Sequence, residues 1–165
     1  MEDSDKKRAE ELSRLVGSRE EWLMRRILDY ARQRDYSKYT STLEEDWRIS
    51  IAGLTGALRE SLGRNGAVPE LGPDEDYALD TVATFAIREA RLHRARGVTI
   101  EMFLGLMKYY RQSYLDLVKA AGLPADGERY SLLYIERFFD RLELGFLREW
   151  FSISDFDAVA QLQEA

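Results

Sequence analysis

The residues best suited to chemistry are three ionisable side chains on otherwise apolar helical faces: Glu89, His93 and Arg111. Glu89 and His93 are four residues apart, so their side chains can touch on a helix. Arg111 falls in the middle of the apolar face of the following helix. Since an isolated charge in a core is strongly unfavourable, each of these residues needs a partner. The three residues therefore predict either a polar pocket or a set of satisfied interior ions.

Two interpretations of these residues remain open. In the first, a small anion or polar metabolite lies between Arg111 and His93 within an aromatic enclosure. The candidates for that enclosure are Trp47, Tyr109, Tyr110 and Tyr114. In the second, each charged head meets a carbonyl, a tyrosine hydroxyl or water inside the fold. We favour the second from sequence alone, because polar networks are ordinary in helical interiors.

His93 is the single histidine of the chain, and a histidine in a helical pocket can also be an axial ligand to haem. We nevertheless expect no cofactor, because a lone histidine on an apolar face is more often structural. The chain has no cysteine, which excludes disulfides, thiolate catalysis and cysteine-based metal sites. Paired histidines and glycine-rich phosphate loops are also missing. We therefore expect no catalytic residue, no metal site and no enzymatic activity.

Helical periodicity runs through almost the whole chain and predicts an all-α bundle of about six helices. Capping residues and glycines mark the expected helix ends. The first expected helix covers residues 4–16, and the second and third start after the capping residues Ser18 and Ser41. The fourth runs from Pro73 to Arg96 and ends at Gly97. Thr99 caps the fifth, which ends at Gly122, and the sixth follows LPADG.

The apolar faces of these helices predict the core. In the helix from Pro73 the expected face consists of Leu79, Val82, Phe85, Ala86 and Ala90. The last segment carries Phe156, Val159 and Leu162 at helical spacing after a serine or aspartate cap, which is typical of an amphipathic exit helix. We therefore divide the chain into a helical domain, residues 1–152, and the start of a connecting helix, residues 153–165.

Composition limits the partners. A net charge of −6 and a pI near 5.0 provide no basic surface for phosphate, so we expect no nucleic acid. No apolar run approaches the roughly 20 residues needed to span a bilayer, and the first residues lack the apolar core of a signal peptide. We expect a protein without membrane contact and with a cytoplasmic location.

Three stretches also carry a family resemblance: YTSTLEEDWRISIAGL, HRARGVTIEMFLGLMKYYRQSYLDLV and RFFDRLELGFLREW. They resemble the N-terminal sensory domain of bacterial histidine kinases that is related to the globin-like, non-haem sensor domain of RsbR-type stressosome proteins. The resemblance covers residues 21–150. It implies a globin-like arrangement of helices, a homodimer, and a signal that passes through the exit helix to a C-terminal PAS, kinase or STAS output module. It implies no particular ligand.

The expected function is therefore a cytoplasmic sensory or regulatory domain. Such a domain changes its dimer packing or the position of its exit helix when a signal binds one state more tightly. These residues contain no phosphoacceptor histidine box and no ATP-binding motif, so any kinase activity would belong to another module. Two alternatives remain: a dimerisation or partner-docking module without a ligand, and a gas sensor in which His93 binds haem.

Overall fold

The expected all-α helical fold is confirmed. The structure, a computed structural model, describes residues 2–36, 43–80 and 84–164, and these ranges contain six α-helices, one 3-10 helix and no strand. The helices are α1 (Glu2–Gly17), α2 (Glu20–Gln33), α3 (Glu44–Leu62), the 3-10 helix η2 (Tyr77–Leu79), α4 (Thr84–Ala95), α5 (Ile100–Ala120) and α6 (Ala125–Glu164).

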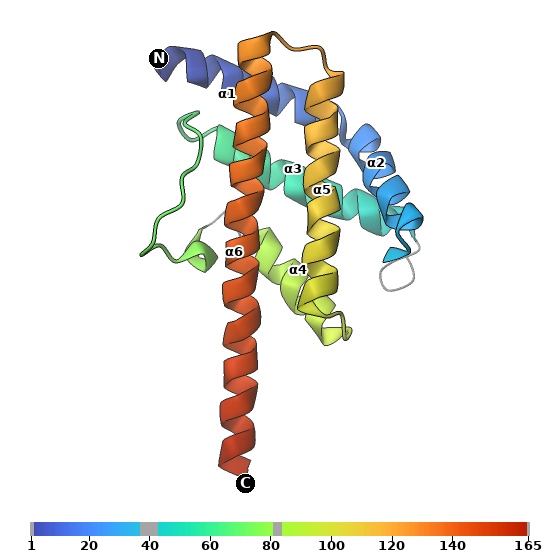
Figure 1. The fold of residues 1–165 in the computed structure, drawn as a ribbon, viewed down its shortest axis with the longest axis vertical. Helices are drawn as coiled ribbons and strands as arrows, with labels where there is room; N and C mark the ends of the chain where they lie inside the picture. Colours follow the sequence, from blue (N-terminus) through green and yellow to red (C-terminus); the bar gives the residue numbers. More distant parts are fainter. Residues whose placement is uncertain (1, 37–42, 81–83, 165) are drawn as a thin grey trace.

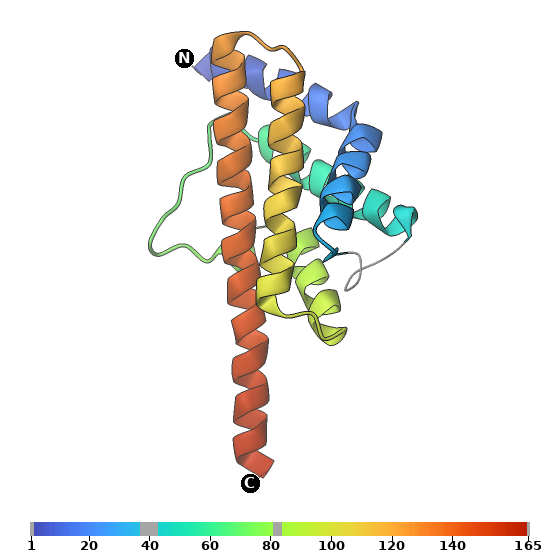
Figure 2. The same cartoon turned by 45° about the vertical axis from the view of Figure 1, so that its right-hand side comes forward.

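An antiparallel hairpin of α5 and α6 is the centre of the arrangement (Figure 1). Helices α1, α2 and α3 cover one side of this hairpin, and α4 packs against it near the start of α5 (Figure 2). Helix α6 then continues well beyond every other helix, so its C-terminal end stands clear of the rest of the molecule. Among the described residues, no helix is long and apolar enough to cross a membrane.

The core forms where the apolar stripes of α3, α5 and α6 meet. All members of the stripes on α3 and α6 are buried: Trp47, Ile51, Leu54, Leu58 and Leu62 on α3, and Ile135, Phe138, Phe139, Leu142, Phe146 and Trp150 on α6. Helix α1 adds a further stripe with residues spaced three and four apart: Ala9, Leu12 and Val16. Large aromatic rings thus fill the centre of the molecule.

The turn between α4 and α5 has the predicted capping residues. The Thr99 hydroxyl oxygen accepts the backbone N–H of Met102 at 3.2 Å and so caps α5. Gly97 has a φ of 82°, which a glycine adopts without steric cost. Its N–H donates to the carbonyl of Arg94, and the following N–H donates to that of His93, as in a Schellman motif.

The caps expected at two other helix starts were not found. The Ser18 hydroxyl donates to the carbonyl oxygen of Leu15 at 3.0 Å, so it completes the last turn of α1 and leaves α2 without a side-chain cap. The prediction was wrong because α1 continues through Gly17, and α2 begins only two residues after Ser18. Ser41 lies outside the described residues; α3 starts at Glu44 and also lacks a side-chain cap.

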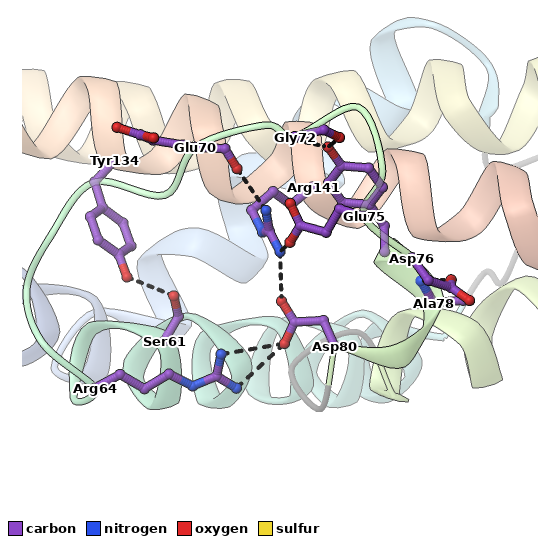
Figure 3. Close-up of polar contacts among 11 residues, drawn as sticks. Ser61, Arg64, Glu70, Gly72, Glu75, Asp76, Ala78, Asp80, Tyr134 and Arg141 are labelled. Atoms are coloured by element: carbon purple, nitrogen blue, oxygen red, sulfur yellow. Dashed lines mark hydrogen bonds and ion pairs between the residues drawn. The ribbon is translucent and has the colours of Figure 1, made fainter.

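The helix expected from Pro73 is the main error, and Figure 3 shows its cause. The segment that follows α3 is irregular, apart from the short helix η2. Arg141 of α6 reaches into it, donates to the carbonyl of Glu70 at 2.6 Å and forms ion pairs with Glu75 and Asp80. Glu75 and Asp80, which lie inside the helix expected from Pro73, are therefore bound to an arginine more than 60 positions away.

The apolar face predicted for this helix changes accordingly. Leu79 is 79 % exposed, so it is not a core residue. Val82 lies outside the described residues, and the structure does not describe the side chains of Ala86 and Ala90. Phe85 does pack against the core, because α4 is helical from Thr84 onward.

The exit helix is not a separate element. Helix α6 runs for 40 residues without a break, through the expected boundary between residues 152 and 153, to Glu164. No serine or aspartate starts a new helix there. Residues 153–164 are thus an extension of the same helix whose earlier part lies in the core.

Two glycines of α3, Gly53 and Gly56, allow a matched test of this packing. A Cβ atom on Gly53 would lie 2.2 Å from Cε2 of Phe85, whereas one on Gly56 would have no atom within 4 Å. We expect Gly56→Ala to raise the free energy of unfolding by about 0.5–1 kcal/mol, because alanine is the better helix former. Gly53→Ala should lower it, because Phe85 must move. Urea denaturation measures both, and equal stabilisation would contradict the contact between α3 and α4.

A second test concerns Arg141. Its hydrogen bond to Glu75 lowers the pKa of that carboxyl group. We expect Arg141→Leu to raise the Glu75 pKa towards its ordinary value and to speed amide exchange between residues 66 and 80, as measured by NMR. Arg129→Leu, at an exposed ion pair with Asp126, is the control and should change neither quantity. An unchanged Glu75 pKa in Arg141→Leu would overturn this assignment.

Candidate functional site

A cavity of about 150 Å³ lies among α3, α4, α5 and α6. Its floor is apolar and buried, and it is formed by Trp47, Leu54, Phe103, Leu106, Met107 and Phe146. Its wall carries four polar side chains: Ser50, Glu89, His93 and Tyr110. Exposed residues surround the mouth, among them Asp46, Ile49, Leu92 and Arg96. A small molecule could therefore enter from solvent, bury an apolar part and keep polar contacts on one side.

Helix α4 supplies most of the polar wall. Glu89 and His93 are four residues apart, which places them on the same face, and Arg96 follows directly after the last residue of α4. The side chains of Glu89 and His93 are 21 % and 17 % exposed, so both lie largely inside the cavity rather than on the surface. Of the apolar face predicted around these two residues, Phe85 also lines the cavity, whereas Leu79 is exposed.

His93 is oriented by its own helix. Its Nδ1 atom lies 2.7 Å from the carbonyl oxygen of Glu89 and 3.7 Å from the carboxylate Oε2 of the same residue. A carbonyl oxygen only accepts hydrogen bonds, so Nδ1 carries the proton, and Nε2 of the neutral ring is an acceptor. The ring also packs 5.1 Å from that of Phe103 on the cavity floor. His93 thus brings a hydrogen-bond acceptor to an otherwise aromatic surface.

Tyr110 and Trp47 form the aromatic side of the cavity, with ring centroids 6.1 Å apart and nearly parallel planes. The Tyr110 hydroxyl is hydrogen-bonded to Ser50. Burial raises the pKa of Tyr110 far above its ordinary value, and the nearby Glu89 carboxylate acts in the same direction. The phenol therefore stays neutral and acts as a hydrogen-bonding group rather than as a base.

Arg111 does not line the cavity, because its partners are two carboxylates elsewhere in the fold. Its Nη2 atom lies 2.9 Å from Oδ1 of Asp140 and 3.1 Å from Oε2 of Glu143, both on α6. Lys108 binds the same Glu143 oxygen at 2.6 Å. The predicted anion between Arg111 and His93 has no place here, because two carboxylates already occupy the guanidinium. The geometry supports the interpretation of an interior ion paired within the fold, with Nε of Arg111 left without a hydrogen-bond partner among the described residues.

Tyr114 also lies outside the cavity lining, although it was a candidate. Its hydroxyl is 2.7 Å from that of Thr55, and its ring packs against Phe139 in the next layer of the core. Burial raises its pKa as well. Of the seven residues predicted to surround a ligand, the cavity brings together four: Trp47, Glu89, His93 and Tyr110. Tyr109 lies outside the lining and stacks on Tyr30, with ring centroids 5.5 Å apart.

Sequence reasoning missed several lining residues. Ser50 lies three residues after Trp47 and four before Leu54, so it is a polar residue on the apolar face of α3, the same signal that identified Glu89. Phe103, Met107 and Phe146 are core residues, and their sequence positions give no sign that they border an empty volume. Only the relative placement of four helices shows that.

Within the described ranges, no group of three or more histidine, aspartate or glutamate side chains is arranged to hold a metal ion. The cavity volume of about 150 Å³ is below the roughly 300 Å³ at which clefts for drug-sized ligands begin. A porphyrin is at least drug-sized, so a haem on His93 would require the four helices to move apart.

No protein-family model, no curated protein and no solved structure matches this chain. The resemblance to bacterial sensory domains and the globin-like arrangement that it implies therefore stay predictions. The cavity and the helices that form it are the basis on which function is argued.

The role of Arg111 can be tested through stability. We expect Arg111→Met to keep the helical fold but to lower the free energy of unfolding by about 1–3 kcal/mol, because the buried Glu143 then keeps only Lys108 as a cationic partner. Urea denaturation followed by circular dichroism measures the change. In the described part of the chain, Oε1 of Glu143 already lacks a hydrogen-bond partner, so the stability of this site is sensitive to the loss of a further partner.

Two further variants complete this test. Glu143→Gln in the Arg111→Met background should recover part of the loss, because it removes a buried charge that has only Lys108 as a partner. Arg137→Met is the matched control; its ion pair with Asp140 is partly exposed and 3.5 Å long, so its loss should matter little. An Arg111→Met variant as stable as the unchanged protein would contradict the assigned role.

Proposed function

We propose that this chain is a sensory or regulatory domain of a bacterial signal-transduction protein, located in the cytoplasm, in which occupancy of the cavity changes the position of α6. The observation that carries the proposal is the double role of α6. It contributes Phe146 to the cavity floor and then continues beyond the body of the molecule as the same unbroken helix.

The contacts at the cavity floor supply the connection. The ring of Phe103 meets that of Phe146 edge to face at 4.8 Å and stacks on that of Trp150 at 6.0 Å. A ligand that displaces Phe103 therefore acts on two positions of α6, one turn apart. The second position, Trp150, lies close to the point where α6 leaves the body.

Helix α4 binds the same part of α6 from the other side. Arg94 donates to the carbonyl oxygen of Trp150 at 3.2 Å, and its guanidinium lies over the indole ring. Arg91 forms an ion pair with Glu149 at 2.6 Å. Because α4 also carries Glu89 and His93, a ligand that shifts α4 would change its hold on α6. Such a two-state element is what a regulatory domain requires.

An exposed apolar stripe on α6 supports the proposed dimer or output partner. Leu133, Leu144 and Phe151 are 42 %, 36 % and 55 % exposed, and at about 100° per residue they fall within about 20° of one line along the helix. We propose that a second copy of the chain, or a PAS, kinase or STAS output module, packs on this stripe. The enzymatic step would then lie in the output module, with no catalytic residue in this chain.

The alternative is a dimerisation or docking module without a ligand, which the same stripe on α6 would also serve. The two differ in what the cavity does. A sensor requires that filling the cavity alters α6, whereas a docking module responds only to protein concentration or to its partner.

Electron–electron distance measurements can decide between them, since the chain has no cysteine and two can be introduced for nitroxide labels. Glu60→Cys on α3 and Gln161→Cys on α6 report the position of the exit helix, with excess unlabelled chain to suppress contacts between copies. Met107→Phe adds volume to the cavity floor. We expect it to change the mean label distance by about 2 Å, the size of helix shifts in known switches.

The control is Ala52→Phe, which adds an aromatic ring at an exposed position of α3 and should leave the distance unchanged. Circular dichroism verifies that both variants fold. An unchanged distance and an unchanged oligomeric state in Met107→Phe would overturn the sensory proposal in favour of the docking module.

A further inference from the structure

The polar groups of the cavity are mostly acceptors. Nδ1 of His93 is committed to a backbone carbonyl, which leaves Nε2 as an acceptor, and the Glu89 carboxylate only accepts. The Tyr110 hydroxyl is already paired with Ser50. A ligand that complements Glu89 and Nε2 of His93 must therefore bring hydrogen-bond donors.

The negative charge of Glu89 is also poorly compensated by neighbouring positive charges. Within the described residues its ion-pair contact is His93, and that distance, 3.7 Å, is long because the Nδ1 proton points to the carbonyl instead. The carboxylate is only 21 % exposed and lies against an aromatic floor. A carboxylate in such surroundings is stabilised by a cation. Among the described lining residues, the one arginine or lysine is Arg96, which forms no ion pair with Glu89.

The cations near the cavity are placed elsewhere. Arg111 is bound to Asp140 and Glu143 on α6. Arg96 lies at the mouth and is exposed, so it is solvated rather than buried beside Glu89. The acidic group of Asp46 shares that mouth. An incoming anion would thus meet the Glu89 carboxylate at the inner wall, whereas an incoming cation would be attracted to it.

The rest of the cavity is apolar and small. The rings of Trp47, Phe103 and Phe146 and the thioether of Met107 form its floor. A volume of about 150 Å³ is close to that of an engineered apolar cavity that binds benzene. It accommodates a short aliphatic group of a few carbon atoms but not an aromatic ring system of several rings.

We infer that this cavity binds a small primary amine with a short, branched aliphatic body, whose ammonium group donates to the Glu89 carboxylate and to Nε2 of His93. This inference rests on the proposed sensory function and specifies its signal. The aliphatic body lies on Trp47, Phe103 and Met107, and the ammonium replaces the missing cationic partner of Glu89. Occupancy fills the space next to Phe103, the residue that contacts α6.

Isothermal titration calorimetry on the unchanged protein tests the inference with matched ligands. The probes are 3-methylbutylamine, 3-methylbutan-1-ol and 3-methylbutanoate, which share their aliphatic body and differ in charge. We expect the amine to bind at least tenfold more tightly than the alcohol and the carboxylate not to bind measurably. Equal affinity for amine and alcohol, or preference for the carboxylate, would overturn the inference without any variant being needed.

Variants locate the site. Glu89→Gln keeps the shape of the side chain but removes its charge, so we expect a loss of at least tenfold in amine affinity and little change for the alcohol. Glu60→Gln, which removes an exposed carboxylate of α3 outside the cavity, should have no effect. Thermal unfolding monitors whether each variant folds. Unchanged amine affinity in a folded Glu89→Gln would place the ligand elsewhere and refute the assignment.

A fourth probe separates two sources of the same ammonium chemistry. Leucine has the same branched body and adds a carboxylate, for which Arg96 at the mouth is the available partner. Binding of leucine that is tighter than that of 3-methylbutylamine, and is lost in Glu89→Gln, supports the inference with an amino acid as the source. Binding of the amine alone supports it with a free amine as the source.

The inference and the proposed function fail in different ways. If the amine binds but α6 does not respond to cavity filling, the cavity is a binding site and the sensory proposal falls. If α6 responds to Met107→Phe but the amine does not bind, the sensory proposal stands and the ligand class is wrong.

Discussion

The pairing of buried tyrosine hydroxyls with α3 is the constraint on which the rest of the structure depends. A phenol in a core needs a hydrogen-bond partner, because an unpaired one costs about 1–3 kcal/mol. Three interior tyrosines of the α5–α6 hairpin find that partner on α3. The pairs are Tyr110 with Ser50, Tyr114 with Thr55 at 2.7 Å, and Tyr134 with Ser61 at 2.6 Å. Because the three bonds are spread along α3, that helix cannot slide on the hairpin without breaking them. Apolar packing alone, which is not directional, would not fix its position so closely.

The cavity follows from this arrangement. The Ser50–Tyr110 pair brings polar groups to the layer where α3, α4 and α5 meet, so apolar side chains cannot close over them without leaving polar atoms buried. Helix α4 does not fill the space either. It approaches α3 at Gly53, where the ring of Phe85 occupies the volume that a side chain would take, and it lines the remaining space with Glu89 and His93. The empty volume is thus bordered by Glu89 and His93 of α4 and by the Ser50–Tyr110 pair, which also holds α3 on the hairpin.

Local features of the sequence were predictable, and distant pairings were not. Thr99 and Gly97 determine the turn between α4 and α5 through hydrogen bonds within a few residues, so their residue types were sufficient to predict that turn. The contact of Glu89 with His93 spans one helical turn, so helical periodicity was sufficient to predict it. No helix starts at Pro73, because Arg141, far along the chain, forms ion pairs with Glu75 and Asp80 of that segment. The inward direction of Arg111 was correct, but its partners on α6 depend on how two helices lie side by side, which periodicity does not specify. The cavity could not be predicted from periodicity either, because its shape depends on the relative positions of four helices.

The continuity of α6 bears on how a small change could be transmitted. At 1.5 Å per residue, the 14 residues from Trp150 to Glu164 extend about 21 Å beyond the last aromatic contact. A tilt of about 5° at that contact would therefore move the end of the helix by roughly 2 Å. A flexible linker at residue 152 would absorb such a tilt, whereas an unbroken helix passes it on. The expected boundary between residues 152 and 153 lies inside α6, so no linker interrupts this path. A helix that begins in the core and ends outside it connects the core to its exposed end without any additional element.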